Sequence, residues 1–488
     1  MVIESLKYKI LQQFGFAPTQ EQGQALDTFV SFLTDRDPQA VMILRGSAGT
    51  GKTSLSGAIV RTLLQIRQKV MLLAPTGRAA KVFSLGSGAP AYTIHRRIYR
   101  EKAFAGVDGQ FSLNDNLYTD TLFMVDEASM IANMGLGGTT FGSGCLLDDL
   151  VKFVYQGHND RLLLIGDKAQ LPPVGEEESP ALSASVMEGY GLKVYECDLN
   201  EVLRQSQSSG ILYNATLIRQ MITHDAVTGL PLIRFKGFAD IVMMPGAELV
   251  ESLGDSYHHV GMDETMVITR SNKRANIYNN GIRNMVLDRE EELSSGDMLM
   301  IVKNNYFWTE KEKKESGEGS AGAVPAFLAN GDRAKVLRVS NYIELYGFRF
   351  ATLLLQLPDY DDYEMQVTGM LDTLQSEAPA LTHGQQEELF RQVEEDYQHF
   401  VPLKADRMKS IRQDAYFNAL QIKYAYAVTC HKAQGGQWAH VYVDQGYMTD
   451  DMLTPDYIHW LYTAFTRATD KLFLVNWPKE QTCEPTDL

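Results

Sequence analysis

Residues 46–53 constrain the fold of this chain more than any other feature of its sequence. They read GSAGTGKT, match the pattern G-x-x-x-x-G-K-[ST], follow the apolar run VMIL and precede a segment with helical periodicity. This context predicts a strand, a glycine-rich loop and a helix, whose backbone N–H groups wrap phosphate oxygens at the positive end of the helix dipole. Lys52 is expected to reach the β- and γ-phosphates of ATP, and Thr53 is expected to ligate Mg²⁺. The residues predicted to line the phosphates are Gly46, Ser47, Ala48, Gly49, Thr50, Gly51, Lys52, Thr53 and Ser54.

The rest of the chain predicts two α/β domains. Its 488 residues exceed the roughly 250–300 residues at which single cores stop growing. Short apolar runs alternate with helical segments, which is typical of buried parallel strands. The first set of runs is VMIL, VMLLA, TLFMV, RLLLIG and KVYEC, and the second is ETMVIT, KYAYAV, HVYV and KLFLV. Each set predicts one doubly wound α/β domain.

Three segments interrupt this pattern. Residues 100–113 are a hairpin candidate with Asp108 and Gly109 at its turn, and residues 310–322 (EKEKKESGEGSAG) are expected to form a solvated loop. The segment from about 330 to 420 begins with alternating, β-rich sequence and ends in an acidic, helical stretch, which predicts a small inserted β-barrel. The predicted domains are residues 1–195 with a hairpin insertion at about 96–116, residues 196–329 together with 421–488, and the inserted barrel at 330–420.

The distribution of charge decides what the net charge of −16 implies. Binding to a phosphate backbone depends mostly on Lys and Arg, so an acidic chain is a poor nucleic-acid binder on average. However, residues 359–399 hold eleven acidic residues and one basic residue, which leaves 44 basic and 50 acidic residues in the rest of the chain. A near-neutral remainder can still line one cleft with positive charge. The composition therefore does not exclude DNA as a partner.

Cysteine usage and hydropathy predict the compartment. The four cysteines, Cys145, Cys197, Cys430 and Cys483, are far apart and form no C-x-x-C pair, which argues against a disulfide framework and a zinc site. No apolar run approaches the roughly 18 residues that span a bilayer, and the N-terminus mixes charged with apolar residues, unlike a signal peptide. A cytoplasmic protein without a membrane partner is expected.

Two further strand ends carry candidate catalytic residues. Asp126 and Glu127 follow the apolar run LFMV, and Gln170 follows the run LLLIG by a few residues. A strand parallel to the one before the phosphate loop would deliver both acids there, with Asp126 holding Mg²⁺ and Glu127 acting as general base. Either acid alone would also fit the N-terminus of a helix, but the adjacent pair favours catalysis. Gln170 is expected to contact the γ-phosphate or the attacking water.

Eight motifs in order give the chain a clear resemblance to a known family. They are GSAGTGKT, APTGRAA, TIHR, VDEA, GDKAQLPPVG, LNEVLRQ, KYAYAVTCHKAQGGQ and LYTAFTRAT, and the match extends from Thr19 to Val475. This order resembles superfamily 1 helicases, and within them the RecD-like and Dda-like group, superfamily 1B, which moves 5′-to-3′. The resemblance implies two RecA-like P-loop NTPase domains, with a wedge hairpin inserted in the first and an SH3-like barrel inserted in the second.

The resemblance also implies roles for individual residues. Gln22 would contact the adenine base, and Arg204 and Arg467 would reach the γ-phosphate. Gly435 and Gln437 would lie near the nucleotide, although the family often has an acidic residue where Gln437 stands. The candidate contacts to single-stranded DNA are Thr76, Thr93, His95, Thr429, His431 and Lys432.

These motifs predict an ATP-dependent DNA helicase that moves 5′-to-3′ on single strands and acts at single/double-strand junctions, as a monomer. An RNA-directed helicase and a nucleotide-switch NTPase without unwinding activity are the alternatives, and the switch would not need Arg204, Arg467 or the strand-contact loops. Phe104 and Phe111 flank the predicted hairpin turn. They are predicted to form the wedge at the last base pair, and packing within the hairpin is an alternative of equal weight.

Overall fold

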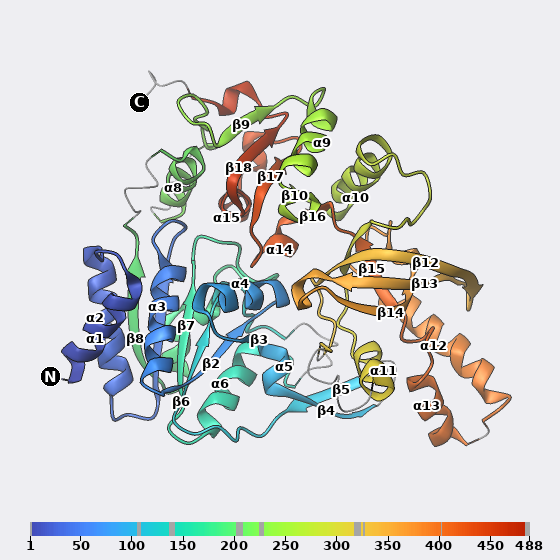
Figure 1. Ribbon diagram of the computed structural model, residues 1–488, viewed down its shortest axis with the longest axis horizontal. Coiled ribbons are helices and arrows are strands. Elements are labelled where there is room, and N and C mark those ends of the chain that lie inside the picture. Colours follow the sequence, from blue (N-terminus) through green and yellow to red (C-terminus); the bar gives the residue numbers. More distant parts are fainter. Residues whose placement is uncertain are drawn as a thin grey trace. The chain divides into compact units, whose positions relative to one another are not determined.

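The computed structural model describes residues 2–104, 109–135, 142–201, 208–223, 229–316, 324–325, 327–401 and 403–483 (Figure 1). They form two compact units. The first is built from the described parts of residues 1–246 together with 433–483, and the second from the described parts of residues 247–432. None of the described helices has the length and apolar character needed to cross a membrane.

A six-stranded parallel sheet forms the centre of the first unit. Its order is β3 (Ala91–Thr93), β2 (Lys69–Ala74), β6 (Thr121–Val125), β7 (Arg161–Gly166), β1 (Ala40–Gly46) and β8 (Lys193–Leu199). The helices that cover it are α1 (Val2–Phe14), α2 (Gln20–Thr34), α3 (Lys52–Gln65), α4 (Gly77–Ser87), α5 (Ile94–Ile98), α6 (Leu146–Gln156) and α7 (Ala184–Gly189).

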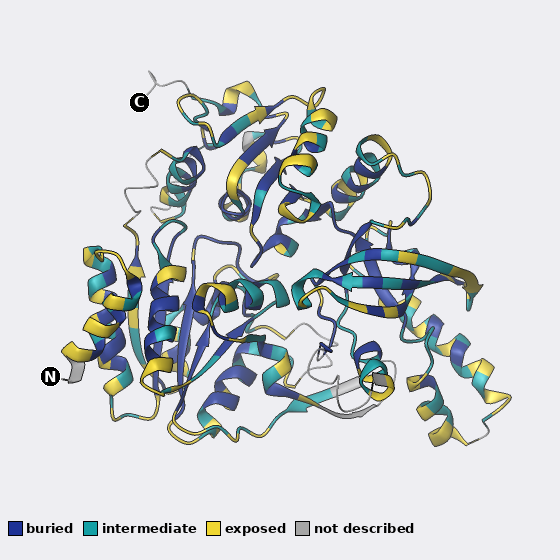
Figure 2. Cartoon of the chain, in the orientation of Figure 1, coloured by how far each residue is buried: buried dark blue, intermediate teal, exposed yellow. Residues whose placement is uncertain are grey.

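Strand β1 explains why this sheet has helices on both faces. All seven of its residues are buried. Met42 and Leu44 belong to the core that includes α1, α2 and α3, whereas Val41 and Ile43 belong to the core that includes α6. Successive side chains of a strand point to opposite faces, so an uninterrupted apolar run requires cover on both sides. Figure 2 shows the central strands β6 and β7 as buried as well. The predicted doubly wound arrangement is confirmed for this domain.

An antiparallel hairpin follows helix α5, as predicted. Its strands are β4 (Tyr99–Phe104) and β5 (Gly109–Leu113), with Phe104 opposite Gly109. Residues 105–108, which include Asp108 of the predicted turn, and the side chain of Phe104 lie outside the described part of the chain. Phe111 is partly buried and packs against the core cluster that contains Tyr99 and Phe123. Packing against the domain therefore accounts for at least part of the role of Phe111.

Three parallel strands from later in the sequence also belong to the first unit. They are β17 (Trp438–Asp444), β18 (Ala468–Val475) and β9 (Ile241–Met244), in the order β17-β18-β9. Helix α15 (Pro455–Phe465) begins at Pro455 after Thr454, whose side chain caps it, and eight of its residues are buried. It packs against helix α8 (Gly210–Thr223).

The second unit contains a closed barrel and a parallel strand pair. The pair is β10 (Thr265–Thr269) with β16 (Ala427–Thr429). The barrel consists of β11 (Met298–Ile301), β12 (Arg333–Leu345), β13 (Phe348–Leu357), β14 (Tyr363–Met370) and β15 (Leu420–Tyr424). Helices α12 (His383–Gln398) and α13 (Lys404–Arg412) pack against the barrel through Leu389, Val393 and Ile411. The other helices are α9 (Leu249–His259), α10 (Asn272–Gly281), α11 (Phe307–Ser316) and α14 (Cys430–Ala433).

The barrel extends beyond the predicted segment 330–420. It also includes β11 and β15, which pair with each other. The single apolar run KYAYAV is divided between β15 of the barrel and β16 of the parallel pair. Tyr426 lies at the division, and its hydroxyl donates to the buried carboxylate of Asp297 (2.8 Å), which also accepts from Arg283 (3.0 Å). These buried hydrogen bonds of Asp297 fix the position of Tyr426, where the chain passes from the barrel to the parallel pair.

The predicted loop at 310–322 is partly wrong. Its first residues continue helix α11 to Ser316, consistent with the high helix propensity of Glu and Lys. Residues 317–323 lie outside the described chain.

Candidate active site

The loop between β1 and α3 has the geometry of a phosphate cradle. Gly49 and Gly51 have φ angles of 77° and 82°, a left-handed conformation that glycine adopts without strain. Gly51 is the residue before helix α3 and offers no side-chain cap, so N–H groups of the first helical turn are available to an anion. A Cβ on Gly46 would lie 2.7 Å from Cγ of Lys52. The loop therefore fits bound phosphate, as predicted from GSAGTGKT.

Lys52 points along this loop toward its first residues. Its ammonium donates to the carbonyl oxygens of Gly46 and Ser47, the second at 3.0 Å. The hydroxyl of Thr50 donates to the same Ser47 oxygen at 2.8 Å. Backbone carbonyls thus hold the lysine charge at the position where the loop would receive the outer phosphates, and a bound phosphate would offer it a stronger, charged acceptor.

Asp126 and Glu127 lie at the carboxyl end of β6, two strands from β1 in the sheet. Burial and the nearby charge of Glu127 raise the pKa of Asp126 to about 7, and the positive charge of Lys52 opposes this rise. A divalent cation would favour the ionised carboxylate strongly, so Asp126 and the exposed hydroxyl of Thr53 are a suitable pair to hold Mg²⁺. Glu127 has a φ of 52°, which is unfavourable for a residue with a side chain and is typical of functional sites.

Gln170 connects Glu127 with Arg467. With the amide oriented to satisfy both neighbours, its nitrogen donates to Oε2 of Glu127 (3.3 Å) and its oxygen accepts from Nη2 of Arg467 (3.2 Å). Arg467 is 2% exposed and donates to the carbonyls of Thr463 (3.0 Å) and Gly436 (3.1 Å). Three predicted catalytic residues, from three separate motifs, are therefore brought into one chain of hydrogen bonds.

Helix α15 contacts the loop 167–171 and the phosphate loop together. The hydroxyl of Tyr462 donates to Asp167 (2.6 Å) and accepts from the N–H of Ala48 (2.9 Å). The N–H of Leu171 donates to the Thr463 hydroxyl (2.8 Å), and its carbonyl accepts from Gln434 (2.7 Å). Tyr462 and Thr463 are not among the residues predicted from the sequence. Their place in LYTAFTRAT, five and four residues before Arg467, is a signal that could have found them.

Replacing Tyr462 by Phe is expected to lower the free energy of unfolding by about 1–3 kcal/mol, because Asp167 and the Ala48 N–H then lose a buried hydrogen-bond partner. Urea denaturation of the two proteins measures the difference. Tyr447→Phe is the matched control, since Tyr447 is 80% exposed and should change little. Equal stability of the Tyr462 variant and the unmodified protein would contradict the bridging role.

Several predicted nucleotide contacts have structural partners in this state. Gln22 is 1% exposed; its amide oxygen accepts from the Thr19 N–H (3.0 Å) and its nitrogen donates to the Thr50 carbonyl (2.9 Å). The second N–H of the Gln22 amide and the second lone pair of its oxygen are not used in these bonds and could contact adenine. The carbonyl of Gln437 accepts from Arg78 (2.6 Å) at the start of α4. Arg204 lies outside the described residues, so its role stays a prediction.

The candidate DNA contacts fall into two groups, one in each unit. Thr76 follows the end of β2, and Thr93 is the last residue of β3, opposite Ala74. Their hydroxyls cap helices α4 and α5, which gives both threonines a structural role as well. The ring of His95 is 5.6 Å from that of Tyr99, and burial lowers the pKa of His95 to about 4.

The second group lies at the end of β16. Thr429 is the last residue of this strand, and His431 and Lys432 follow in α14, with His431 exposed. Among the described residues, the ammonium of Lys432 is buried without a hydrogen-bond partner. Burial and the charge of Lys423 lower the pKa of Lys432 to about 8. An anion such as a phosphate would supply the missing partner.

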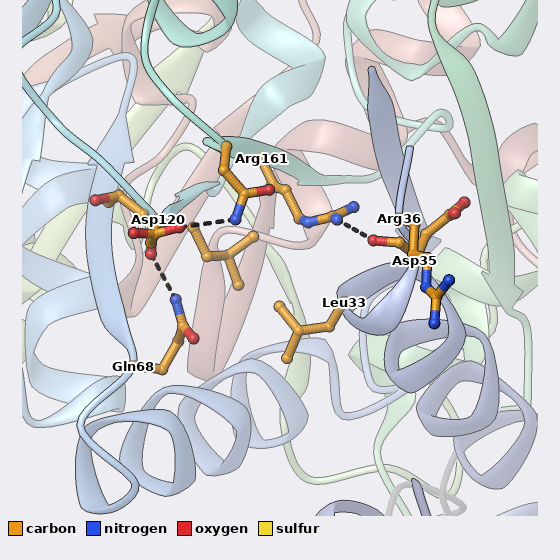
Figure 3. Close-up of a pocket in the computed structure, with 9 residues that line it drawn as sticks. Leu33, Asp35, Arg36, Gln68, Asp120 and Arg161 are labelled. Carbon is orange, nitrogen blue, oxygen red and sulfur yellow. Dashed lines mark hydrogen bonds between the residues drawn. The ribbon is translucent and has the colours of Figure 1, made fainter. Parts of the chain in front are cut away.

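A polar pocket of about 570 Å³ lies at the amino ends of the strands of the first sheet, opposite the carboxyl ends that carry the phosphate loop (Figure 3). Thr121 and Arg161, the first residues of β6 and β7, contribute to its lining. Gln68 donates to the Asp120 carbonyl (2.7 Å) and Arg161 donates to the Asp35 carbonyl. Because the phosphate loop follows the carboxyl end of a parallel strand, this pocket is not part of the nucleotide site.

Comparison with known proteins matches the two parts of the chain that build this site. The model of the AAA domain matches residues 17–229, and the model of the UvrD-like helicase C-terminal domain matches residues 424–475. The ATP-dependent RecD2 DNA helicase of Deinococcus radiodurans is 30% identical over 157 residues, 32% of this chain and 18% of that protein. The ATP-dependent DNA helicase dda of Enterobacteria phage T4 is 25% identical over 267 residues, 53% of this chain and 55% of that protein. These matches support the predicted resemblance of the chain to superfamily 1B helicases.

The chain spans less than two thirds of the length of either relative. A solved structure of the Pif1 helicase from Bacteroides in complex with ADP-AlF3 and single-stranded DNA is 13% identical, with a TM-score of 0.46, over 96% of this chain and 95% of that chain. The fold described above is α/β, with parallel strands in both units, the hairpin β4–β5 and the closed barrel. The predicted α/β fold class is confirmed.

Proposed function

We propose that the chain is an ATP-dependent DNA helicase that moves 5′-to-3′ along single-stranded DNA and separates duplexes at single/double-strand junctions. The hydrogen-bonded chain Glu127–Gln170–Arg467 beside the phosphate loop carries this proposal. It joins a general base, a polar residue that can orient water and an arginine, which are the parts that phosphoryl transfer to water requires. The relatives named above as ATP-dependent DNA helicases support DNA as the substrate.

Each residue has a distinct task in the proposed hydrolysis. Glu127 accepts the proton of the attacking water, and Gln170 holds that water in line with the γ-phosphate. Lys52 and Arg467 stabilise the charge that develops on the phosphate oxygens. Mg²⁺, held by Thr53 and Asp126, would supply further neutralisation when bound. Arg204 is proposed as the second arginine at the γ-phosphate.

A short path connects the nucleotide to the proposed DNA track. Arg467 donates to the carbonyl of Gly436. A Cβ on the neighbouring Gly435, whose φ is 72°, would lie 3.1 Å from the hydroxyl of Thr76, so this turn packs closely against a proposed DNA contact. Movement of Arg467 on binding or release of phosphate would therefore shift the turn at residues 435–436 and change its contact with Thr76. Such coupling is what a translocating ATPase needs to convert hydrolysis into steps.

The hairpin β4–β5 is proposed as the wedge. Replacing residues 104–110 by a Gly-Ser turn, with Phe111 kept because it packs against the core, should leave DNA-stimulated ATPase and displacement of streptavidin from biotinylated single strands largely intact. Duplex unwinding from a 5′ tail should collapse, because strand separation needs a rigid obstacle. Leu117→Ser, at a side chain that is 89% exposed in the following connection, is the control. Unwinding at the unmodified rate would remove the wedge role, and a parallel fall in ATPase would assign the hairpin to support of the fold.

The ATPase assay with two homopolymers tests the substrate class. Poly-dT is expected to stimulate ATP hydrolysis strongly and poly-U weakly. Stronger stimulation by poly-U would favour an RNA-directed helicase, and turnover that neither polymer changes would favour a nucleotide switch.

A further inference from the structure

Arg219 on helix α8 lies directly beside the start of the phosphate loop. Its Nη1 donates to the hydroxyl of Ser47 at 2.5 Å, and Nη1 and Nη2 lie 3.5 Å and 3.4 Å from the carbonyl oxygen of Asn200. Ser47 is 7% exposed, so the guanidinium is placed at a nearly buried position of the loop. None of the motifs discussed above includes Arg219.

The contacts of Arg219 leave its charge unneutralised. Among the described residues, no ion pair joins it to a carboxylate, and both of its acceptors are neutral oxygens. A half-buried guanidinium with neutral partners is costly compared with one that binds an anion. Three of its five N–H groups make the contacts observed, so two remain for phosphate oxygens before any of these contacts is exchanged.

A second cation meets Arg219 on the same residue. Lys52 donates to the Ser47 carbonyl at 3.0 Å, while Arg219 donates to the Ser47 hydroxyl. Two like charges that converge on one neutral serine repel each other, and an anion between them would relieve this repulsion. Tyr462, whose hydroxyl accepts from the Ala48 N–H, is also close enough to interact with this charge: burial raises the pKa of Tyr462, and the charge of Arg219 opposes the rise. Arg219 therefore lies on the Ser47–Ala48 side of the loop, where Lys52 ends, and not at the N-terminus of α3.

We propose that Arg219 binds the γ-phosphate of ATP directly, as an arginine in addition to Arg467 and Arg204, and thereby distinguishes the triphosphate from the diphosphate. This inference rests on the proposed ATPase function. The guanidinium is held by Ser47 and Asn200, and on binding of ATP it exchanges the Ser47 hydroxyl for phosphate oxygens.

Equilibrium titration of the full chain with Mg²⁺-ATPγS and with Mg²⁺-ADP tests the proposal. Arg219→Ala should weaken ATPγS binding about tenfold or more, the scale of one charge-assisted hydrogen bond, while ADP binding stays within about twofold. Arg219→Lys keeps the charge without the fork and should lose part of the preference. Gln220→Ala, an exposed neighbour on the same helix, is the matched control and should bind both nucleotides as the unmodified protein does.

Thermal unfolding of the variants without nucleotide identifies those that keep the native fold. The ratio of the affinity for ATPγS to the affinity for ADP is compared among these variants only. Equal weakening for both nucleotides would overturn the proposal, because it would show that Arg219 only supports the loop. Affinities for both nucleotides equal to those of the unmodified protein would overturn it as well. If the unmodified protein bound neither nucleotide, the proposed function itself would fail, which is a distinct result.

Discussion

Replacing Glu127 by Gln is expected to lower ATP turnover by about 10²-fold or more, the scale of a lost general base, while binding of ATP and Mg²⁺ persists. Gln has nearly the same shape and can still accept the hydrogen bond from Gln170, but it does not take a proton from water. Steady-state hydrolysis with saturating single-stranded DNA, together with a nucleotide titration, gives both quantities.

Glu178→Gln is the control for this substitution, because Glu178 is an exposed acid in the same domain. Its turnover should match that of the unmodified protein. Near-normal turnover of Glu127→Gln would assign the base to another residue.

Replacing Lys52 by Ala in the otherwise unmodified protein is expected to reduce hydrolysis about 10²-fold or more, because a preorganised positive charge at the transferring phosphate is lost. The same change removes the charge that counteracts the raised pKa of Asp126, so the carboxylate proposed to hold Mg²⁺ is less readily ionised. Single-stranded DNA binding should persist, since Lys52 contacts the loop carbonyls of Gly46 and Ser47 and none of the proposed DNA contacts.

Hydrolysis and the affinity for an oligo-dT strand, measured on the same preparation, test this expectation. Lys9→Ala is the control, at an exposed lysine of helix α1. An equal loss of DNA binding in a folded Lys52 variant would contradict the separation of the two sites.

The first α/β domain could be predicted from its sequence because each of its signals is local. The run VMIL before the glycine-rich loop, and the acids Asp126 and Glu127 after another apolar run, are read within about ten residues. Parallel strands have their carboxyl ends at one edge of the sheet, so local order along the chain already placed the phosphate loop, Asp126, Glu127 and Gln170 together.

The remaining features depend on contacts between distant residues, which no local pattern records. The run KYAYAV has no break in hydropathy, although its two halves enter different sheets beside Tyr426 and the buried Asp297. Arg219 and Tyr462 are ordinary helical positions in the sequence, and only the packing of α8 and α15 brings them to Ser47 and Ala48. The family resemblance supplied Arg467, but not the hydrogen bonds that join it to Gln170.

Unwinding of duplexes with a single-stranded tail at one end tests the central claim most directly. The substrates are matched 5′-tailed, 3′-tailed and blunt duplexes of the same sequence, each incubated with the unmodified protein and either ATP or ATPγS. We expect the strands of the 5′-tailed duplex to separate with ATP alone, with little separation of the 3′-tailed or blunt duplex and none with ATPγS. Preferential separation of the 3′-tailed duplex would contradict the proposed direction, and ATP hydrolysis without separation of any duplex would contradict the proposal that this chain is a helicase by itself.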